Sequence, residues 1–177
     1  MTKQVFILLG GLISVDGPVD SEGMEYLGRL IREQVNDVKV SIEDWGDWAK
    51  FIQPIQSANH TGDKVVLIGY SGGGSRAADL CDALYWSHPR GEIDLFVAYD
   101  PSPKWQIPVI GGNVKSVICY HNLNPMMPSP FGELGGGVIK SSGKPPAIQT
   151  IDISEQHLLV QENLTLHADT ISAIRTL

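Results

Sequence analysis

Cysteine and basic residues are both scarce in this sequence, and their scarcity limits the classes of protein that it can represent. The two cysteines, Cys81 and Cys119, fall in an expected helix and an expected buried strand, a spacing that suggests neither a disulfide framework nor a zinc site. The 13 lysines and arginines are outnumbered by 20 aspartates and glutamates, so the net charge is −7. A nucleic-acid or anionic-membrane partner would need a basic face. We therefore expect reduced core cysteines and neither of those partners.

Long hydrophobic runs are absent as well. The first apolar run, at residues 5–9, is too short for the core of a signal peptide and is followed by no small-residue cleavage site. No run approaches the length of a transmembrane helix. These absences predict a cytoplasmic protein without a transmembrane segment. Hydrophobic residues still make up 42% of the 177 residues, which is enough for one compact domain over residues 1–177. An oligomeric state does not follow from any of these features.

The most informative stretch is residues 65–78, which indicate a strand, a tight turn and a helix. Residues 65–68 form a short aliphatic run, typical of a parallel strand that is covered on both faces. Apolar residues at helical spacing follow soon afterwards: Ala77, Leu80, Cys81, Leu84 and Tyr85. Between the two, residues 69–73 match Gly-x-Ser-x-Gly, the pattern of a nucleophile elbow around Ser71. Glycines two residues before and after such a serine let strand and helix approach.

An elbow here would project the Ser71 hydroxyl beside a helix N-terminus, where the Gly72 amide can face a developing oxyanion. A second pattern overlaps it, because residues 72–77 fit Gly-x-Gly-x-x-Ala, a dinucleotide-binding fingerprint. That fingerprint normally expects an acid about 20 residues later, whereas Asp100 comes later than that. The alternative function is therefore a non-catalytic α/β module that binds a nucleotide or a protein partner through this turn.

Strand and helix patterns alternate along the whole sequence. Strands are expected at residues 5–9, 38–42, 65–68, 92–99, 114–120 and 148–153. Helices are expected after Asp20 or Ser21, over residues 44–59 with a kink at Pro54, after the elbow, and at the C-terminus. This order predicts a three-layer α/β domain with a mostly parallel sheet of about six strands and no large lid domain. Residues 101–113 and 122–146 lack periodicity, and irregular loops of that length are usually functional.

With these motifs in place, the chain resembles the α/β-hydrolases, in particular the small lipase-like and cutinase-like serine esterases, over nearly its whole length. The resemblance implies a catalytic triad in the chain order serine, acid, histidine, with each residue at or just beyond the carboxyl end of a strand. Ser71, Asp100 and His157 meet that order. The chain is therefore expected to be a serine hydrolase of carboxylic esters or thioesters that forms an acyl-enzyme and needs no metal or other cofactor.

The acid has two competitors in the sequence. In most of the family the acid follows the strand that here covers residues 114–120, but no carboxylate comes after that strand until Glu133. Asp152 lies inside the last strand, so its side chain should point sideways from the sheet. Asp100 combines a carboxylate, a strand end and a place next to the nucleophile strand, which makes it the expected acid.

The base also has an alternative. A serine hydroxyl is a poor nucleophile at neutral pH, so a histidine must take its proton and return it to the leaving group. His157 follows the last strand, whereas His167 falls within the first turns of the terminal helix beside its apolar stripe. We expect His157 to be the base and His167 to be a packed or surface residue.

The resemblance also bears on the substrate side of the site. It implies a second oxyanion amide after the first strand, at Gly11 or Leu12, although residues 9–12 lack the His-Gly motif of lipases. An open site for a small-molecule ester is expected. Its flanking residues are expected to be Tyr70, Trp105, Met126, Met127 and Phe131.

Overall fold

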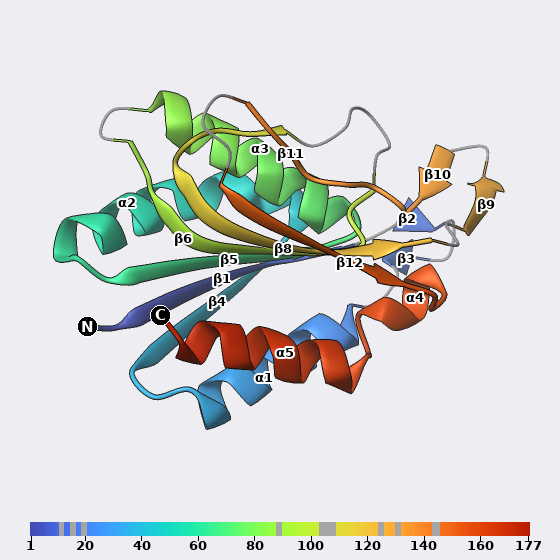
Figure 1. The fold of residues 1–177 in the computed structure, drawn as a ribbon, viewed down its shortest axis with the longest axis horizontal. Coiled ribbons are helices and arrows are strands. Elements are labelled where there is room, and N and C mark those ends of the chain that lie inside the picture. The colour runs from blue at the N-terminus through green and yellow to red at the C-terminus, as the bar shows by residue number, and fades with distance from the viewer. Residues whose placement is uncertain are drawn as a thin grey trace.

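A six-stranded sheet forms the middle layer of the molecule (Figure 1). The computed structural model describes residues 1–10, 13–14, 17–18, 21–87, 90–102, 109–123, 126–129, 132–142 and 146–177. The strands lie in the spatial order β4 (Val38–Asp44), β1 (Lys3–Leu9), β5 (Lys64–Tyr70), β6 (Ile93–Tyr99), β8 (Val114–Asn122) and β12 (Ala147–Ile153). Every neighbouring pair is parallel. The predicted parallel sheet of about six strands is confirmed.

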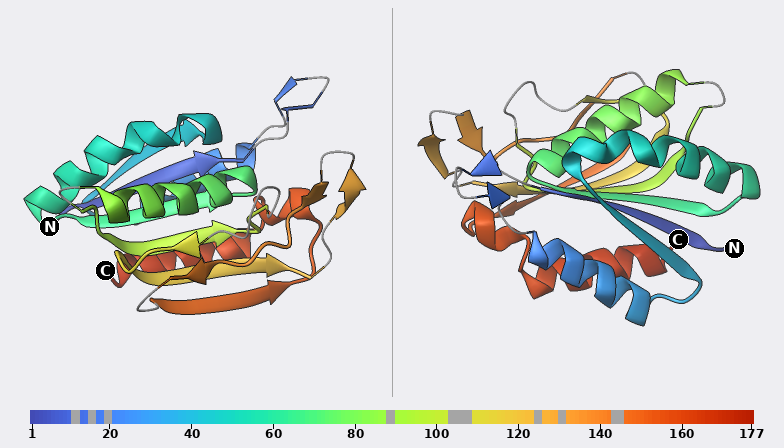
Figure 2. Two further views of the ribbon diagram at one scale, coloured as in Figure 1. Left: turned by 90° about the horizontal axis from the view of Figure 1, so that it is seen from above. Right: turned by 180° about the vertical axis from the view of Figure 1, so that it is seen from behind.

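Helices cover both faces of this sheet, which makes the predicted three layers. On one face lie α1 (Glu22–Gln34), the short α4 (His157–Val160) and α5 (Leu164–Arg175) (Figures 1 and 2). On the other face lie the 3₁₀ helix η1 (Trp45–Phe51), α2 (Ile52–Thr61) and α3 (Gly72–Trp86). Because all six strands run the same way, their carboxyl ends meet at a single edge of the sheet, where ligands usually bind in such folds.

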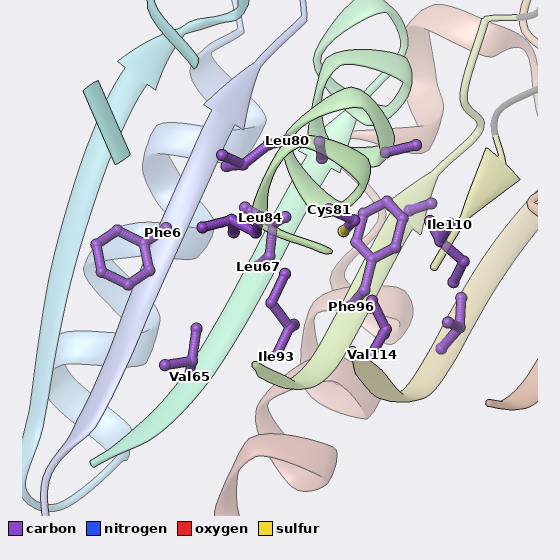
Figure 3. Close-up of a cluster of buried hydrophobic side chains, with 14 of the residues drawn as sticks. Phe6, Val65, Leu67, Leu80, Cys81, Leu84, Ile93, Phe96, Ile110 and Val114 are labelled. Atoms are coloured by element: carbon purple, nitrogen blue, oxygen red, sulfur yellow. The ribbon is translucent and has the colours of Figure 1, made fainter. Parts of the chain in front are cut away.

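The core consists of two apolar clusters, one on each face of the sheet. Alternate strand residues such as Phe6, Leu67 and Phe96 pack against Leu80 and Leu84 of α3 (Figure 3). The intervening residues pack in the same way against α1 and α5. Every residue of β6 is buried, as expected for a strand covered on both faces.

Both cysteines lie in this core as free thiols, as expected. Burial raises the pKa of the Cys119 thiol to about 11. It also raises the pKa of Cys81, a completely buried residue of α3. Neither thiol is therefore ionised near neutral pH, and both behave as small apolar residues.

Two sequence predictions differ from the structure. The helix expected over residues 44–59 begins as η1 and becomes the α-helix α2 only at Ile52, so Pro54 lies in the first turn of α2. A proline there needs no N–H partner and does not kink the helix, which makes the predicted kink wrong. The stretches without periodicity also contain short strands, namely β7 (Val109–Ile110), β9 (Met126–Ser129), β10 (Gly132–Leu134) and β11 (Lys140–Ser141).

The remaining short strands, β2 (Ile13–Ser14) and β3 (Gly17–Pro18), pair antiparallel after β1. β9 and β10 form another antiparallel pair, and both pairs lie near the carboxyl ends of the main strands (Figures 1 and 2). Within the described ranges, no helix is both long enough and apolar enough to cross a membrane.

Candidate active site

Ser71 occupies the sharp turn between β5 and α3. Its backbone has φ 52° and ψ −121°, a conformation that costs a non-glycine residue about 1–3 kcal/mol. The glycines on either side permit this turn. A Cβ on Gly69 would lie 2.5 Å from the Gly73 carbonyl oxygen, and a Cβ on Gly73 would lie 2.4 Å from that of Leu8. Only glycine therefore lets α3 approach β5 and β1 this closely.

The same packing bears on the dinucleotide fingerprint of residues 72–77. These residues form the first turns of α3, and Gly73 and Gly74 are buried. Gly73 faces the end of β1, and a Cβ on Gly74 would lie 3.0 Å from the Pro101 Cβ. Because these two glycines face other parts of the chain, their backbone offers no open cradle for a pyrophosphate. The geometry does not favour the nucleotide-binding alternative.

Asp100 follows β6 on a second turn with positive φ, 43°. Its N–H donates to the Tyr120 carbonyl at 2.8 Å, and its side chain is completely buried. Two backbone hydrogen bonds tie this turn to the elbow: Ser71 N–H donates to the Tyr99 carbonyl at 3.0 Å, and Ser102 N–H donates to the Ser71 carbonyl at 3.1 Å. The two strained turns thus hold each other in place.

His157 is the first residue of α4, and its imidazole lies between the serine and the acid. Its Nε2 is 2.9 Å from Ser71 Oγ, and its Nδ1 is 2.5 Å from Asp100 Oδ2. The three residues are 7%, 0% and 1% exposed for Ser71, Asp100 and His157. A serine, an imidazole and a carboxylate in this order can pass the serine proton to the imidazole and stabilise the resulting imidazolium.

Tyr70 contacts His157 through both its ring and its hydroxyl. Its ring stacks on the imidazole, with centroids 5.2 Å apart and an angle of 26° between the planes, and its hydroxyl donates to the His157 carbonyl at 3.1 Å. Burial and the nearby Asp100 charge raise the pKa of the Tyr70 phenol, so it stays a neutral donor. The sequence suggested Tyr70 as a substrate contact, but it is only 4% exposed and contacts the histidine.

Comparison with known proteins adds a fold family to this geometry. No family model and no curated protein matches the sequence. Among solved structures, an α/β superfamily protein from Xanthomonas campestris pv. campestris is similar with a TM-score of 0.58 and 12% identity, over 98% of this chain and 99% of that one. The RedJ thioesterase of the prodiginine pathway in Streptomyces coelicolor has a TM-score of 0.55 and 8% identity, over 96% and 85% of the two chains. The esterase Est2 from Thermogutta terrifontis has a TM-score of 0.55 and 11% identity, over 98% and 79%. This chain has the α/β-hydrolase fold.

The competitors for base and acid lie elsewhere in this α/β-hydrolase fold. His167 is completely buried in α5, and its Nε2 donates to the Gln161 carbonyl at 2.7 Å. Burial lowers the pKa of His167, although the Gln161 hydrogen bond opposes that shift. Asp152 is exposed on β12, and its Oδ1 accepts from His121 Nδ1 at 3.0 Å. It therefore points sideways from the sheet, as expected.

Of the residues expected to form the oxyanion hole, Gly72 lies in the described part of the chain. Gly72 opens α3, so its N–H belongs to the first turn of a helix, whose amides have no acceptor within the helix. Gly10 lies against the elbow, because a Cβ there would be 3.1 Å from Ser71 Cβ, and its carbonyl accepts a hydrogen bond from the Ser21 hydroxyl. Gly10, the residue that follows β1, therefore lies beside Ser71.

Several predicted residues lie outside the described part of the chain. Gly11, Leu12, Trp105 and Phe131 are among them, and only the backbone of Met126 and Met127 is described, in β9. The same holds for Glu133 in β10. The expectation that Trp105, Met126, Met127 and Phe131 flank the substrate thus remains a prediction.

Sequence reasoning missed the residues that hold the second oxygen of Asp100. The Gly136 N–H donates to Asp100 Oδ1 at 2.6 Å, and the Asn122 N–H donates to the same oxygen at 3.3 Å. Gly135 packs against both Asp100 and His157. The signal was the run of three glycines at 135–137, whose requirement for special backbone conformations is visible in the sequence but whose partner is not.

A hollow of about 460 Å³ lies between α1 and the carboxyl end of β4. It is lined by Leu9, Glu25, Arg29, Arg32, Ile42, Glu43 and Asp44. None of Ser71, Asp100 and His157 lines it. Over the described residues, no group of three or more His, Cys, Asp or Glu side chains has the arrangement of a metal site.

Proposed function

We propose that this chain is a serine hydrolase that cleaves small-molecule carboxylic esters or thioesters through an acyl-enzyme intermediate. The observation that carries the proposal is the buried hydrogen-bonded chain from Asp100 through His157 to Ser71, at the carboxyl edge of the sheet. A positive-φ serine on a strand-to-helix turn has a backbone cost that a purely structural turn would avoid with glycine. Its persistence here supports a catalytic role.

The proposed reaction follows from that geometry. His157 Nε2 takes the Ser71 proton as Oγ attacks the carbonyl carbon, and Asp100 stabilises the imidazolium that forms. The Gly72 N–H, together with an amide after Gly10, stabilises the oxyanion of the tetrahedral intermediate. Collapse of that intermediate expels the alcohol or thiol, which takes its proton from His157. Water then attacks the acyl-enzyme with His157 again as the base, and collapse of the second tetrahedral intermediate releases the carboxylic acid while His157 returns a proton to Ser71 Oγ.

The substrate class is proposed from the surroundings of the triad. An esterase and a thioesterase are among the proteins with the same fold, and one mechanism serves both substrates. The β9–β10 hairpin approaches the acid through Gly135 and Gly136, and it carries Met126 and Met127. We propose that this hairpin and Phe131 contact the acyl chain. All groups that take part in the proposed reaction besides substrate and water are side chains and backbone amides of this chain.

Labelling with a fluorophosphonate tests the nucleophile. We expect one adduct per chain, mapped to Ser71 by peptide mass spectrometry, and no adduct in Ser71→Ala. Turnover of a p-nitrophenyl ester should fall by about 10⁴-fold in Ser71→Ala, His157→Ala and Asp100→Asn. A parallel assay with a thioester substrate measures which acyl donor reacts faster.

The matched control is His167→Ala, which removes a second buried histidine on the same face of the sheet and should leave turnover of the same order as in the wild type. An adduct on Ser75, or none on any residue, would contradict the proposal. So would an inactive His167→Ala together with an active His157→Ala.

A further inference from the structure

The acid of the site is bonded at both of its carboxylate oxygens. Oδ2 lies 2.5 Å from His157 Nδ1, while Oδ1 accepts from the Gly136 N–H at 2.6 Å and from the Asn122 N–H at 3.3 Å. The next amide, Gly137 N–H, donates to the Pro101 carbonyl at 2.8 Å. Residues 136 and 137 therefore bond to Asp100 and to the residue after it, which fixes the side chain and the backbone of the same turn.

Gly135 lies directly over the hydrogen bond between acid and imidazole. A Cβ at this position would be 2.2 Å from Asp100 Oδ2 and 2.5 Å from His157 Nδ1, the same two atoms that share the bond. Gly135 and Gly136 have φ values of 79° and 73°, which residues other than glycine rarely adopt. Backbone of this kind can approach a polar pair closely and exclude water from it.

These contacts have a chemical consequence for a buried carboxylate. Asp100 is completely buried, so each of its carboxylate oxygens needs a hydrogen-bond donor from the protein in place of water. The Gly136 amide supplies one to Oδ1, which leaves Oδ2 free to face Nδ1 of the imidazole. Rotation of the carboxylate would break both hydrogen bonds at once. The glycine segment, residues 135–137, therefore fixes the orientation of the Asp100 carboxylate.

We propose that Gly135 and Gly136, at the end of the β9–β10 hairpin, are positioning residues for the pair of Asp100 and His157. The consequence for turnover rests on the proposed function, whereas the consequence for the shared hydrogen bond does not. The glycines that orient the Asp100 carboxylate thus follow directly after the β9–β10 hairpin.

The test substitution is Gly135→Ala, with Gly62→Ala as its matched control. Gly62 has φ 75°, close to the 79° of Gly135, but a Cβ on Gly62 would meet nothing within 4 Å. Alanine therefore introduces comparable backbone strain at the two positions, and only Gly135→Ala adds a collision with the acid and the imidazole. Thermal melting measures the shared strain.

The first readout is the proton between His157 Nδ1 and Asp100 Oδ2, which should resonate far downfield in ¹H NMR because the bond is short and charge-assisted. We expect that resonance in wild type and Gly62→Ala, and its loss in Gly135→Ala. Turnover should fall about 10²-fold in Gly135→Ala with little change in KM, since the acid and not the substrate is displaced.

The outcomes separate the two proposals. A downfield resonance that is present in the wild type and absent from Gly135→Ala, in a protein without esterase activity, would support the positioning role and contradict the proposed function. An active wild type whose resonance and turnover survive in Gly135→Ala overturns the positioning role, and so does a wild type without the resonance.

A second measurement covers a Gly135→Ala protein that does not fold. Amide hydrogen exchange at Gly136 is compared between wild type and Asp100→Ala, where the acceptor of its hydrogen bond is removed. In Asp100→Ala, exchange is expected to become faster at Gly136 than in the wild type, and to stay unchanged at β8 amides that do not bond Asp100, which excludes Asn122. Unchanged exchange at Gly136 would overturn the inference.

Discussion

At the scale of single residues, backbone strain is concentrated at the proposed active site. Three non-glycine residues with positive φ occur among the described residues, and two of them are Ser71 and Asp100. The third, Asp37, lies in the turn between α1 and β4. Strain of this kind persists only where surrounding contacts determine the conformation. Here those contacts are the hydrogen bonds that join the two turns to each other and to the glycine segment.

The buried His167 predicts a pH dependence of stability at the same scale. Burial lowers the pKa of His167 in the folded protein from its ordinary value of 6.5, with partial opposition from the Gln161 hydrogen bond. The unfolded chain therefore binds a proton first as the pH falls, and the folded state loses stability below about pH 6.5, by at most about 1.4 kcal/mol per pH unit from this residue.

Urea unfolding of the wild type and His167→Gln between pH 7.5 and 5 measures this effect. The wild type should lose more stability than the variant over the lower part of that range. Parallel losses in the two proteins would show that His167 does not contribute to the pH dependence.

At the scale of elements, the unit of β5, elbow and α3 depends on how closely the helix approaches the sheet. The first turn of α3 lies against the carboxyl end of β1 as well as β5, since a Cβ on Gly73 would be 2.4 Å and 2.6 Å from the carbonyl oxygens of Leu8 and Leu9. These are backbone atoms that cannot rotate away. The helix itself must move if Gly73 gains a side chain.

Gly73→Ala should therefore lower the free energy of unfolding by about 1–3 kcal/mol, the usual cost of overpacking. Gly46→Ala in η1 is the matched control, because a Cβ there would meet nothing within 4 Å, and it should change stability by less than about 0.5 kcal/mol. Urea unfolding of both variants measures the difference. Equal stability of the two variants would contradict this account of the elbow.

At the scale of the whole molecule, the two edges of the sheet have different tasks. The carboxyl edge carries the proposed active site. At the opposite edge, Asp94 near the start of β6 connects neighbouring strands, and this residue is only 5% exposed. Asp94 accepts from Lys64 Nζ at 3.0 Å, Lys115 Nζ at 2.8 Å and the Val65 N–H at 3.0 Å. One carboxylate thus links β5, β6 and β8, about 20 Å from Asp100 at the other end of β6.

Asp94→Ala should lower the free energy of unfolding by about 1–3 kcal/mol, because the buried Val65 N–H loses its acceptor. Burial alone would raise the pKa of Asp94, but the hydrogen bonds from Lys115, Val65 and Lys64 together lower it below 3.8. The contribution of Asp94 is therefore present above about pH 3.8 and is lost as the pH falls through the lower pKa of the folded state.

Urea unfolding at pH 7, paired with ester turnover, tests this separation of tasks. We expect reduced stability and unchanged kcat in Asp94→Ala. A large loss of kcat in a fully folded variant would show that the two edges are coupled.

Features that depend on neighbouring residues were predictable from the sequence alone. Patterns of apolar residues predicted all six strands of the main sheet. A strand covered on both faces needs apolar residues at nearly every position, whereas the half-covered strand at residues 38–42 was predicted from its alternation, and β4 lies at an edge of the sheet. The Gly-x-Ser-x-Gly pattern predicted the elbow, since strand, turn and helix are consecutive in the chain. Ser71, Asp100 and His157 were also proposed from chain order, and the structure brings their side chains together, while their catalytic roles stay predictions.

Features that depend on residues far apart in the chain were decided by the tertiary structure. The glycine run at 135–137 showed no sign in the sequence that Gly136 would meet Asp100 across 36 residues. Tyr70 was expected to face the substrate, yet it stacks on His157, across 87 residues. Secondary structure follows from the periodicity of nearby side chains, so sequence by itself determined the layers and the order of strands and helices. The partners of a buried carboxylate or imidazole are set by whichever backbone amides and rings the folded loops bring beside it, and that depends on the packing of the whole chain.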